Sequence, residues 1–323
     1  MEKITLLDTA VGSTNKGDEI IMKCIEQELR DITKQYFVMK APTHLCSFNA
    51  LECLFSLPDS ASEIAGSKYK FVCGTNLLSD RMMNRTNQWD INLFTCKPFI
   101  GCVLMGVGAL KTDSPDFYTA RLYKKVLSKQ YVHSVREQTA YSMMKKLGFS
   151  VLNTGCPTLW KLTEEFCREI PKEKSDSVVF TLTDYKQSAE QDRLIVETLK
   201  KKYDKLYFWL QGAHDSEYLQ SVADTNGIEI IEPSVEAYEK VLREDVDYVG
   251  TRLHAGIYAM RHKKRSIILR VDKRMDSMAQ CIPNNCISRS ETENLGDMID
   301  SKIETKVNID FDAVRQWKGQ FEG

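Results

Sequence analysis

The chain has 323 residues, with 44 Lys plus Arg against 45 Asp plus Glu, so its formal net charge at pH 7 is −1. A nearly neutral chain has no global field to attract nucleic acid or an acidic membrane, and any anionic ligand needs a local cluster of cations. The apolar fraction of 42% and the charged fraction of 28% exclude disordered, collagen-like and coiled-coil proteins. The length suggests two domains or one large α/β unit.

Ten cysteines raise the question of disulfides or zinc. Their spacing contains no Cys-x-x-Cys pair, and only five histidines are present to complete a site, so we expect no metal centre. Residues 1–10 lack the pattern of a secretory signal, and the apolar segment 98–110 is too short and Gly-rich to cross a bilayer. We therefore expect a reduced, cytoplasmic protein without a transmembrane segment.

Short apolar runs alternate with amphipathic stretches, a pattern typical of β-α units and a parallel sheet. In the first half, we expect strands at 4–7, 36–39, 70–73, 103–106, 131–135 and 151–153, and helices at 18–33, 114–129 and 138–147. After a polar linker at 171–176, we expect strands at 177–183, 205–211, 228–231, 248–250 and 266–270, and helices at 189–202, 217–224, 235–242 and 253–260.

This pattern predicts an α/β protein with two Rossmann-like parallel-sheet domains, at 1–170 and 177–295. A tail at 296–323 ends in an amphipathic helix at 311–321, whose packing the pattern does not place. Ligands of such sheets bind outside the carboxyl ends of the strands, so the expected site is a central cleft that the two domains face.

The loop after the first strand is small, polar and glycine-containing, and it leads directly into a helix. Ser13, Asn15 and Gly17 are candidates to bring backbone N–H groups close to an anionic or sugar ligand. The alternative for the two acids that follow is structural, with Asp18 as N-cap and Glu19 as a favourable first-turn acid.

Two further strand ends carry glycines that allow close approach to the backbone. One is Gly74, followed by Thr75 and Asn76, and the other is the pair Gly106 and Gly108 in the loop 106–110. Binding and simple tight turns remain equally open for both loops.

Arginines follow two more predicted strands. Arg136 stands before a helix, where its planar fork suits phosphate or carboxylate, and pairing with Glu137 or another acid is the alternative. Arg252, Leu253 and His254 open another helix, whose positive dipole end favours anions and where the imidazole can exchange a proton. A structural histidine and an arginine that caps a neighbouring strand are the alternatives there.

Taken in order, these loops resemble the polysaccharide pyruvyl transferase family over about residues 4–270. The matching segments are Asn15-x-Gly17-Asp18-Glu19, Gly74 with Leu77-Leu78, Gly106-x-Gly108, Ser134-Val135-Arg136-Glu137, Gly155-x-Pro157 and Thr251-Arg252-Leu253-His254-Ala255.

The resemblance implies a GT-B-like fold and transfer of a pyruvyl group from phosphoenolpyruvate to a sugar of a surface-polysaccharide precursor. The product is a cyclic ketal, and phosphate is released. The resemblance implies catalytic roles for His254 and Arg252 and binding roles for Arg136, Leu253 and the loop residues named above. The implied partners are phosphoenolpyruvate, as donor substrate and not cofactor, and a nucleotide- or lipid-linked sugar. A lipid-linked acceptor would bring peripheral membrane contact.

Two departures from the family pattern leave alternatives open. Thr75 and Asn76 stand where many relatives have glycines, and Cys156 stands where relatives commonly have aspartate. These departures motivate one rival function, an inactive relative that binds a sugar precursor. The enzymatic rival is a glycosyltransferase of the same GT-B architecture that uses a nucleotide sugar.

Overall fold

The computed structural model describes residues 1–55, 57–83, 88–109, 114–271 and 275–321. Its contacts divide the chain into two compact units. Unit 1 contains Met1–Ser13, Ile21–Trp160 and Asp310–Gly323, and unit 2 contains Thr14–Ile20 and Lys161–Ile309. The chain thus passes between the units several times, whereas the sequence predicted consecutive domains at 1–170 and 177–295 followed by a tail at 296–323.

Residues 161–170 belong to unit 2 because their side chains bind there. The ammonium groups of Lys161 and Lys263 lie 4.9 and 5.8 Å from the centre of the Phe166 ring. Lys263 also forms an ion pair with Glu169, with 2.5 Å between Nζ and Oε2. The polar composition of 171–176 predicted the domain boundary at that segment. Composition carries no information about contacts between residues 161–170 and the rest of unit 2.

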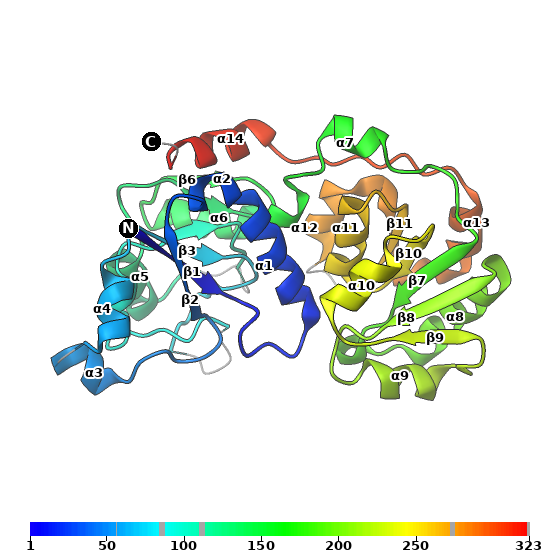
Figure 1. Cartoon of the computed structure of the whole chain (residues 1–323), viewed down its shortest axis with the longest axis horizontal. Helices are drawn as coiled ribbons and strands as arrows, with labels where there is room; N and C mark the ends of the chain where they lie inside the picture. Colours follow the sequence, from blue (N-terminus) through cyan, green and yellow to red (C-terminus); the bar gives the residue numbers. More distant parts are fainter. Residues whose placement is uncertain (56, 84–87, 110–113, 272–274, 322–323) are drawn as a thin grey trace. The chain divides into compact units, whose positions relative to one another are not determined.

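Unit 1 is built on a parallel sheet whose strands run in the order β2-β1-β3-β4 (Figure 1). The strands are β1 Lys3–Asp8, β2 Phe37–Pro42, β3 Tyr69–Cys73 and β4 Val103–Met105. The parallel pair β5 His133–Val135 and β6 Val151–Asn153 joins through a bridge between Val107 and Val135. The strand order reverses between β1 and β3, and ligands of open parallel sheets bind at such a reversal.

The helices of unit 1 cover a sheet whose central strand β3 is buried along its whole length. They are α2 Arg30–Thr33, α3 Ala50–Phe55, α4 Asp59–Ala65, α5 Phe117–Val126, α6 Gln138–Lys146, α14 Phe311–Gly319, the 3-10 turns η1 Lys97–Phe99 and η2 Pro157–Leu159, and most of α1 Lys16–Glu28, which begins in unit 2. The single helix expected at 18–33 is two helices, because Ile32 N–H bonds the carbonyl of Leu29, three residues back.

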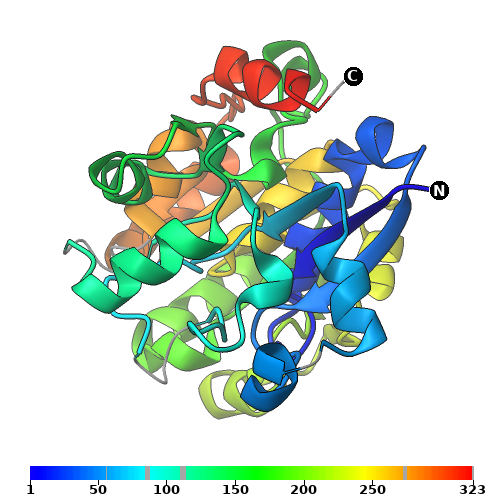
Figure 2. The ribbon, with the colours of Figure 1, turned by 90° about the vertical axis from the view of Figure 1, so that its left-hand side faces the viewer.

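The C-terminal helix α14 packs in unit 1 through aromatic side chains. The rings of Trp317 and Phe321 lie 5.8 and 4.9 Å from that of Phe71 on β3. The Gln320 amide bonds both the N–H and the carbonyl of Val132. Figure 2 looks onto this unit, which contains both the blue N-terminal strand and the red C-terminal helix.

Unit 2 is built on a parallel sheet of six strands in the order β12-β11-β10-β7-β8-β9 (Figure 1). The strands are β7 Ser177–Thr181, β8 Lys205–Trp209, β9 Ile228–Ile231, β10 Asp247–Gly250, β11 Ser266–Arg270 and β12 Cys286–Ser288. The order reverses between β7 and β10, so the loops after these two strands meet at the expected ligand position of this sheet.

The helices of unit 2 follow its strands in the manner of β-α units. They are α7 Glu164–Arg168, α8 Ala189–Lys202, α9 Asp215–Val222, α10 Val235–Val241, α11 Leu253–Arg261, α12 Asp276–Cys281, α13 Leu295–Asp300, and the 3-10 segments η3 Asp184–Lys186, η5 Pro283–Asn285 and η6 Arg289–Asn294. The predicted α/β class with parallel sheets is confirmed. The central cleft stays a prediction.

A buried histidine makes the stability of unit 1 depend on pH. His133 is fully buried on β5; its Nδ1 accepts from Leu104 N–H at 3.1 Å, and its Nε2 lies 2.8 Å from the carbonyl oxygen of Ser128. These partners select the neutral ring with the proton on Nε2. Burial lowers the pKa of His133 to about 4, from an ordinary value of 6.5.

We expect His133 to remove on the order of 3 kcal/mol of stability as the pH falls from 6.5 to 4. The unfolded chain takes up the proton near 6.5 and the folded chain only near 4, so the unfolded state binds more protons in this window. Urea unfolding of the wild type and of His133→Gln at several pH values measures the difference. The exposed His214→Gln serves as control. Parallel curves for the wild type and His133→Gln would contradict the assignment.

Candidate functional site

Arg136 is a half-buried cation at the carboxyl end of β5. Its Nη2 donates to Asn76 Oδ1 at 2.5 Å, while its Nη1 is buried without a hydrogen-bond partner. Glu137 instead caps α6 and accepts from Ala109 N–H at 2.9 Å. Within the described ranges, Arg136 forms no ion pair. Its charge therefore has no carboxylate partner there, and Nη1 keeps a donor without an acceptor.

Glycine at position 108 permits this arrangement. A Cβ there would lie 2.5 Å from Arg136 Nε and 2.6 Å from Asn76 Oδ1. The neighbouring Thr75 has a φ of +41°, in the left-handed region that favours glycine. Thr75 therefore adopts a glycine-like backbone, and the neighbouring Asn76 side chain accepts the hydrogen bond from Arg136.

Two other glycines lie where the chain is crowded. Gly74 has a φ of +59°, and a Cβ there would lie 2.4 Å from Ile21 Cγ2. Gly106 has a φ of +62°, and its Cβ would lie 2.1 Å from Pro157 Cδ. Both residues are thus explained by packing. Leu110, at the end of the predicted loop 106–110, lies outside the described residues.

Cys156 is buried just before η2, and Thr158 Oγ1 donates to its Sγ at 3.1 Å. The side chain that the sequence singles out at this position is therefore packed inside unit 1.

Asn15 and Gly17 lie in unit 2, in the segment that opens α1. Asn15 Oδ1 accepts from Gly17 N–H at 2.9 Å and from Gln211 Nε2 at 2.8 Å, and Lys16 N–H donates to the carbonyl of Gln211 at 2.9 Å. A Cβ at Gly17 would lie 2.9 Å from Gln211 Nε2. The helix begins at Lys16, so Asp18 lies in its first turn and is not the N-cap.

Arg252 stands between β10 and α11, at the strand reversal of unit 2. Its side chain is 3% exposed and forms ion pairs through Nη2 with Asp215 and Asp184, the latter at 2.9 Å. Its Nε donates to the carbonyl of Leu182 at 3.2 Å. Nη1 makes no hydrogen bond to any described residue, so one corner of the guanidinium is left for a ligand. Burial raises the pKa of Asp215, and Arg252 opposes this rise.

Leu253 and His254 are the first two residues of α11, and both are half-buried. His254 thus lies next to Arg252 at a helix N-terminus, as predicted. Ser13 is half-buried and belongs to unit 1, where its N–H donates to the carbonyl of Ala10 at 3.2 Å.

Six of the twelve predicted site residues fall into two groups. Asn76, Gly108 and Arg136 come together in unit 1, and Asn15, Gly17 and Arg252 are linked in unit 2. Three residues that make the second link were not predicted from the sequence, namely Gln211, Gly212 and Asp215. The available signal was a glycine three residues after the end of strand β8, followed by an acid in the first turn of a helix.

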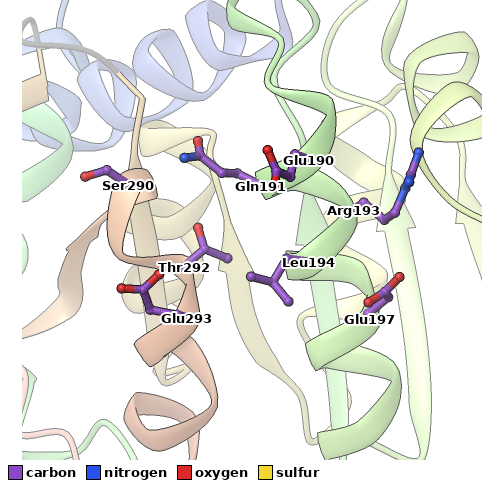
Figure 3. Close-up of a pocket in the computed structure, with 8 residues that line it drawn as sticks. All are labelled: Glu190, Gln191, Arg193, Leu194, Glu197, Ser290, Thr292 and Glu293. Atoms are coloured by element: carbon purple, nitrogen blue, oxygen red, sulfur yellow. The ribbon is translucent and has the colours of Figure 1, made fainter.

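A pocket of about 390 Å³ lies between α8 and η6 in unit 2 (Figure 3). Its lining carries three glutamates and one arginine. None of the predicted site residues lines it, and its negative charge disfavours an anionic donor. The lining residues are Glu190, Gln191, Arg193, Leu194, Glu197, Ser290, Thr292 and Glu293.

Two further features, a metal site and a membrane span, are absent from the part of the chain that the structure describes. Across the residues that the structure describes, no group of three or more His, Cys, Asp or Glu side chains could hold a metal ion. Within the same ranges, no helix combines the length and apolar character needed to span a bilayer.

Parallel sheets with arginines just beyond their strands define an α/β protein suited to small anionic ligands. The chain belongs to the polysaccharide pyruvyl transferase family, a family of transferases, whose sequence model matches residues 15–273. All predicted site residues except Ser13 lie within this match. No curated protein matches the chain.

The chain is similar to several solved structures, among them an epimerase and a heptosyltransferase. UDP-GlcNAc 2-epimerase from Neisseria meningitidis is 14% identical, with 100% of this chain and 93% of that chain covered and a TM-score of 0.46. The E. coli heptosyltransferase WaaC is 11% identical, with 83% and 88% covered and a TM-score of 0.34.

Proposed function

We propose that this transferase moves the pyruvyl group of phosphoenolpyruvate onto two hydroxyls of a sugar in a surface-polysaccharide precursor. Both sugar oxygens bond to the enol carbon, and the bond from that carbon to the phosphate oxygen breaks. One hydroxyl proton ends on the methylene carbon, which becomes a methyl group, and the other leaves with phosphate. The product is a cyclic ketal.

The observation that carries the proposal is the uncompensated charge of Arg136, with its buried and unpaired Nη1. A donor with a carboxylate and a phosphate supplies the missing acceptors. In the proposed mechanism, Arg252 binds the donor through Nη1, and His254 transfers the proton to the methylene carbon or the leaving oxygen. Within the described residues the ten cysteines form no disulfide, which supports the proposal of a reducing, cytoplasmic setting.

The direct test is phosphate release that requires both phosphoenolpyruvate and a sugar acceptor, with the ketal identified by product mass. We expect His254→Ala and Arg252→Ala to lower kcat/KM by about 100-fold or more. The exposed His214→Ala is the matched control and should keep full activity.

Three results would count against parts of the proposal. Full activity in both Arg252→Ala and His254→Ala would remove the site assignment. Transfer from a nucleoside diphosphate sugar without phosphoenolpyruvate would establish the glycosyltransferase alternative. Calorimetry that detects a sugar precursor but no donor would establish an inactive, sugar-binding relative.

A further inference from the structure

Asp215 is a fully buried carboxylate whose two oxygens have different partners. It is the first residue of α9, and its Oδ1 forms the ion pair with Arg252 Nη2. Its Oδ2 accepts from the backbone N–H groups of Gln211 and Gly212, at 3.0 and 2.7 Å. A single side chain therefore holds both a guanidinium and a backbone turn.

The turn held by Asp215 is the same turn that binds the start of α1. The carbonyl of Gln211 accepts from Lys16 N–H, and its Nε2 donates to Asn15 Oδ1. Gly212 also forms an antiparallel bridge with Asn15. The chain of bonds thus runs from Arg252 through Asp215 and the turn to Asn15.

Glycine at position 212 brings the guanidinium and the turn into contact. A Cβ there would lie 2.4 Å from Arg252 Nη2 and 3.0 Å from Asp215 Oδ1. The guanidinium therefore packs directly on the backbone of the turn, with no room for a side chain between them.

We propose that Asp215 is a positioning residue, which sets the orientation of Arg252 and the Asn15 loop together so that both meet the same donor. The assignment rests on the proposed function. It adds a residue that touches neither donor nor acceptor and acts through Arg252. A carboxylate is required because it offers acceptors on both oxygens, whereas an asparagine must turn its NH2 group toward one set of donors.

The chain offers a matched control in Asp247, which also pairs with a buried arginine. Asp247 begins β10, at the opposite end of the strand that leads to Arg252, and its Oδ2 lies 2.8 Å from Arg265 Nη1. The other N–H groups of Arg265 donate to backbone carbonyls, including those of Ile299 and Ser301. The Asp247–Arg265 pair therefore holds the chain at the end of α13.

The test compares Asp215→Asn with Asp247→Asn. We expect Asp215→Asn to bind phosphoenolpyruvate about 10- to 100-fold more weakly by calorimetry, the effect of losing a charged hydrogen bond. Asp247→Asn should lose stability in urea and keep the donor affinity. If Asp215 only neutralised Arg252, removal of its charge would tighten anion binding, so unchanged or tighter binding in Asp215→Asn overturns the proposal.

A second readout does not depend on the reaction. In Asp215→Ala, amide hydrogen exchange at Lys16 should become faster than in Asp247→Ala, because the turn that accepts its N–H is released. Equal exchange in the two variants overturns the proposed link. If the wild type binds no phosphoenolpyruvate, the proposed function fails, and the exchange rates alone decide whether Asp215 positions the loop.

Discussion

Replacing Arg136 by methionine is expected to weaken phosphoenolpyruvate binding by about 100-fold, the effect of losing a charged hydrogen bond to an anion. The guanidinium has an amide partner in Asn76 and no carboxylate partner in the described part of the chain. An anionic donor would therefore lose its main counter-charge in unit 1. Calorimetry with phosphoenolpyruvate measures the change.

The same substitution should leave the stability unchanged or raise it by up to about 1 kcal/mol. Nη1 is buried without an acceptor, and a buried donor without a partner costs about 1–3 kcal/mol. Methionine removes that group together with the bond to Asn76. Urea unfolding measures this second effect.

Two further variants make the result specific. Arg136→Lys keeps the charge but not the planar fork, so we expect an intermediate affinity. Arg315→Met removes an exposed arginine that pairs with Asp312 on α14, and it should leave donor binding unchanged. Wild-type affinity in Arg136→Met would show that the donor binds elsewhere.

Replacing Gly106 by alanine is expected to cost about 3 kcal/mol or more of stability. A left-handed backbone costs an L-residue about 1–2 kcal/mol, and overpacking adds about 1–3 kcal/mol. The φ of Gly106 is +62°, and the new Cβ would lie 2.1 Å from Cδ and 3.3 Å from the backbone N of Pro157. A proline ring has no rotamer by which to move aside.

Gly148→Ala separates the two causes. Gly148 has a φ of +86°, and a Cβ there would meet nothing within 4 Å. The Gly148→Ala substitution should therefore lower the stability only by the cost of the left-handed backbone, about 1–2 kcal/mol. Replacing Pro157 by alanine in the Gly106→Ala background should recover part of the loss. Equal costs at positions 106 and 148 in urea unfolding would contradict the packing argument.

Several elements were predictable because local pattern decides them. The strands Ile228–Ile231 and Ser266–Arg270 and the helix Ala189–Lys202 appear at the predicted residues. The helix carries apolar residues at helical spacing, and each strand is a short, mostly apolar run bounded by polar residues. β12 was missed because its three residues, Cys286–Ser288, are all half-buried and form no apolar run. Pairing with β11 makes this segment a strand.

The candidate site was predictable where its residues are neighbours in the sequence. Arg252 and His254 are close in sequence and open one helix, so the motif alone placed them side by side. Asp215 is 37 residues from Arg252 along the chain, and no local pattern relates the two. The alternative for Arg136, a pair with Glu137, was open because the sequence does not show that Glu137 caps α6.

By itself, the sequence determined the α/β class, the order of most strands along the chain and the strand ends that carry arginine, glycine and histidine. These features depend on periodicity and on neighbours in the chain. Only the tertiary structure decided that Thr14–Ile20 belongs with unit 2, that α14 completes unit 1, and that Asp215 links Arg252 to Asn15. Such features arise from hydrogen bonds, ion pairs and aromatic packing between distant residues, which exist only once the sheets have formed.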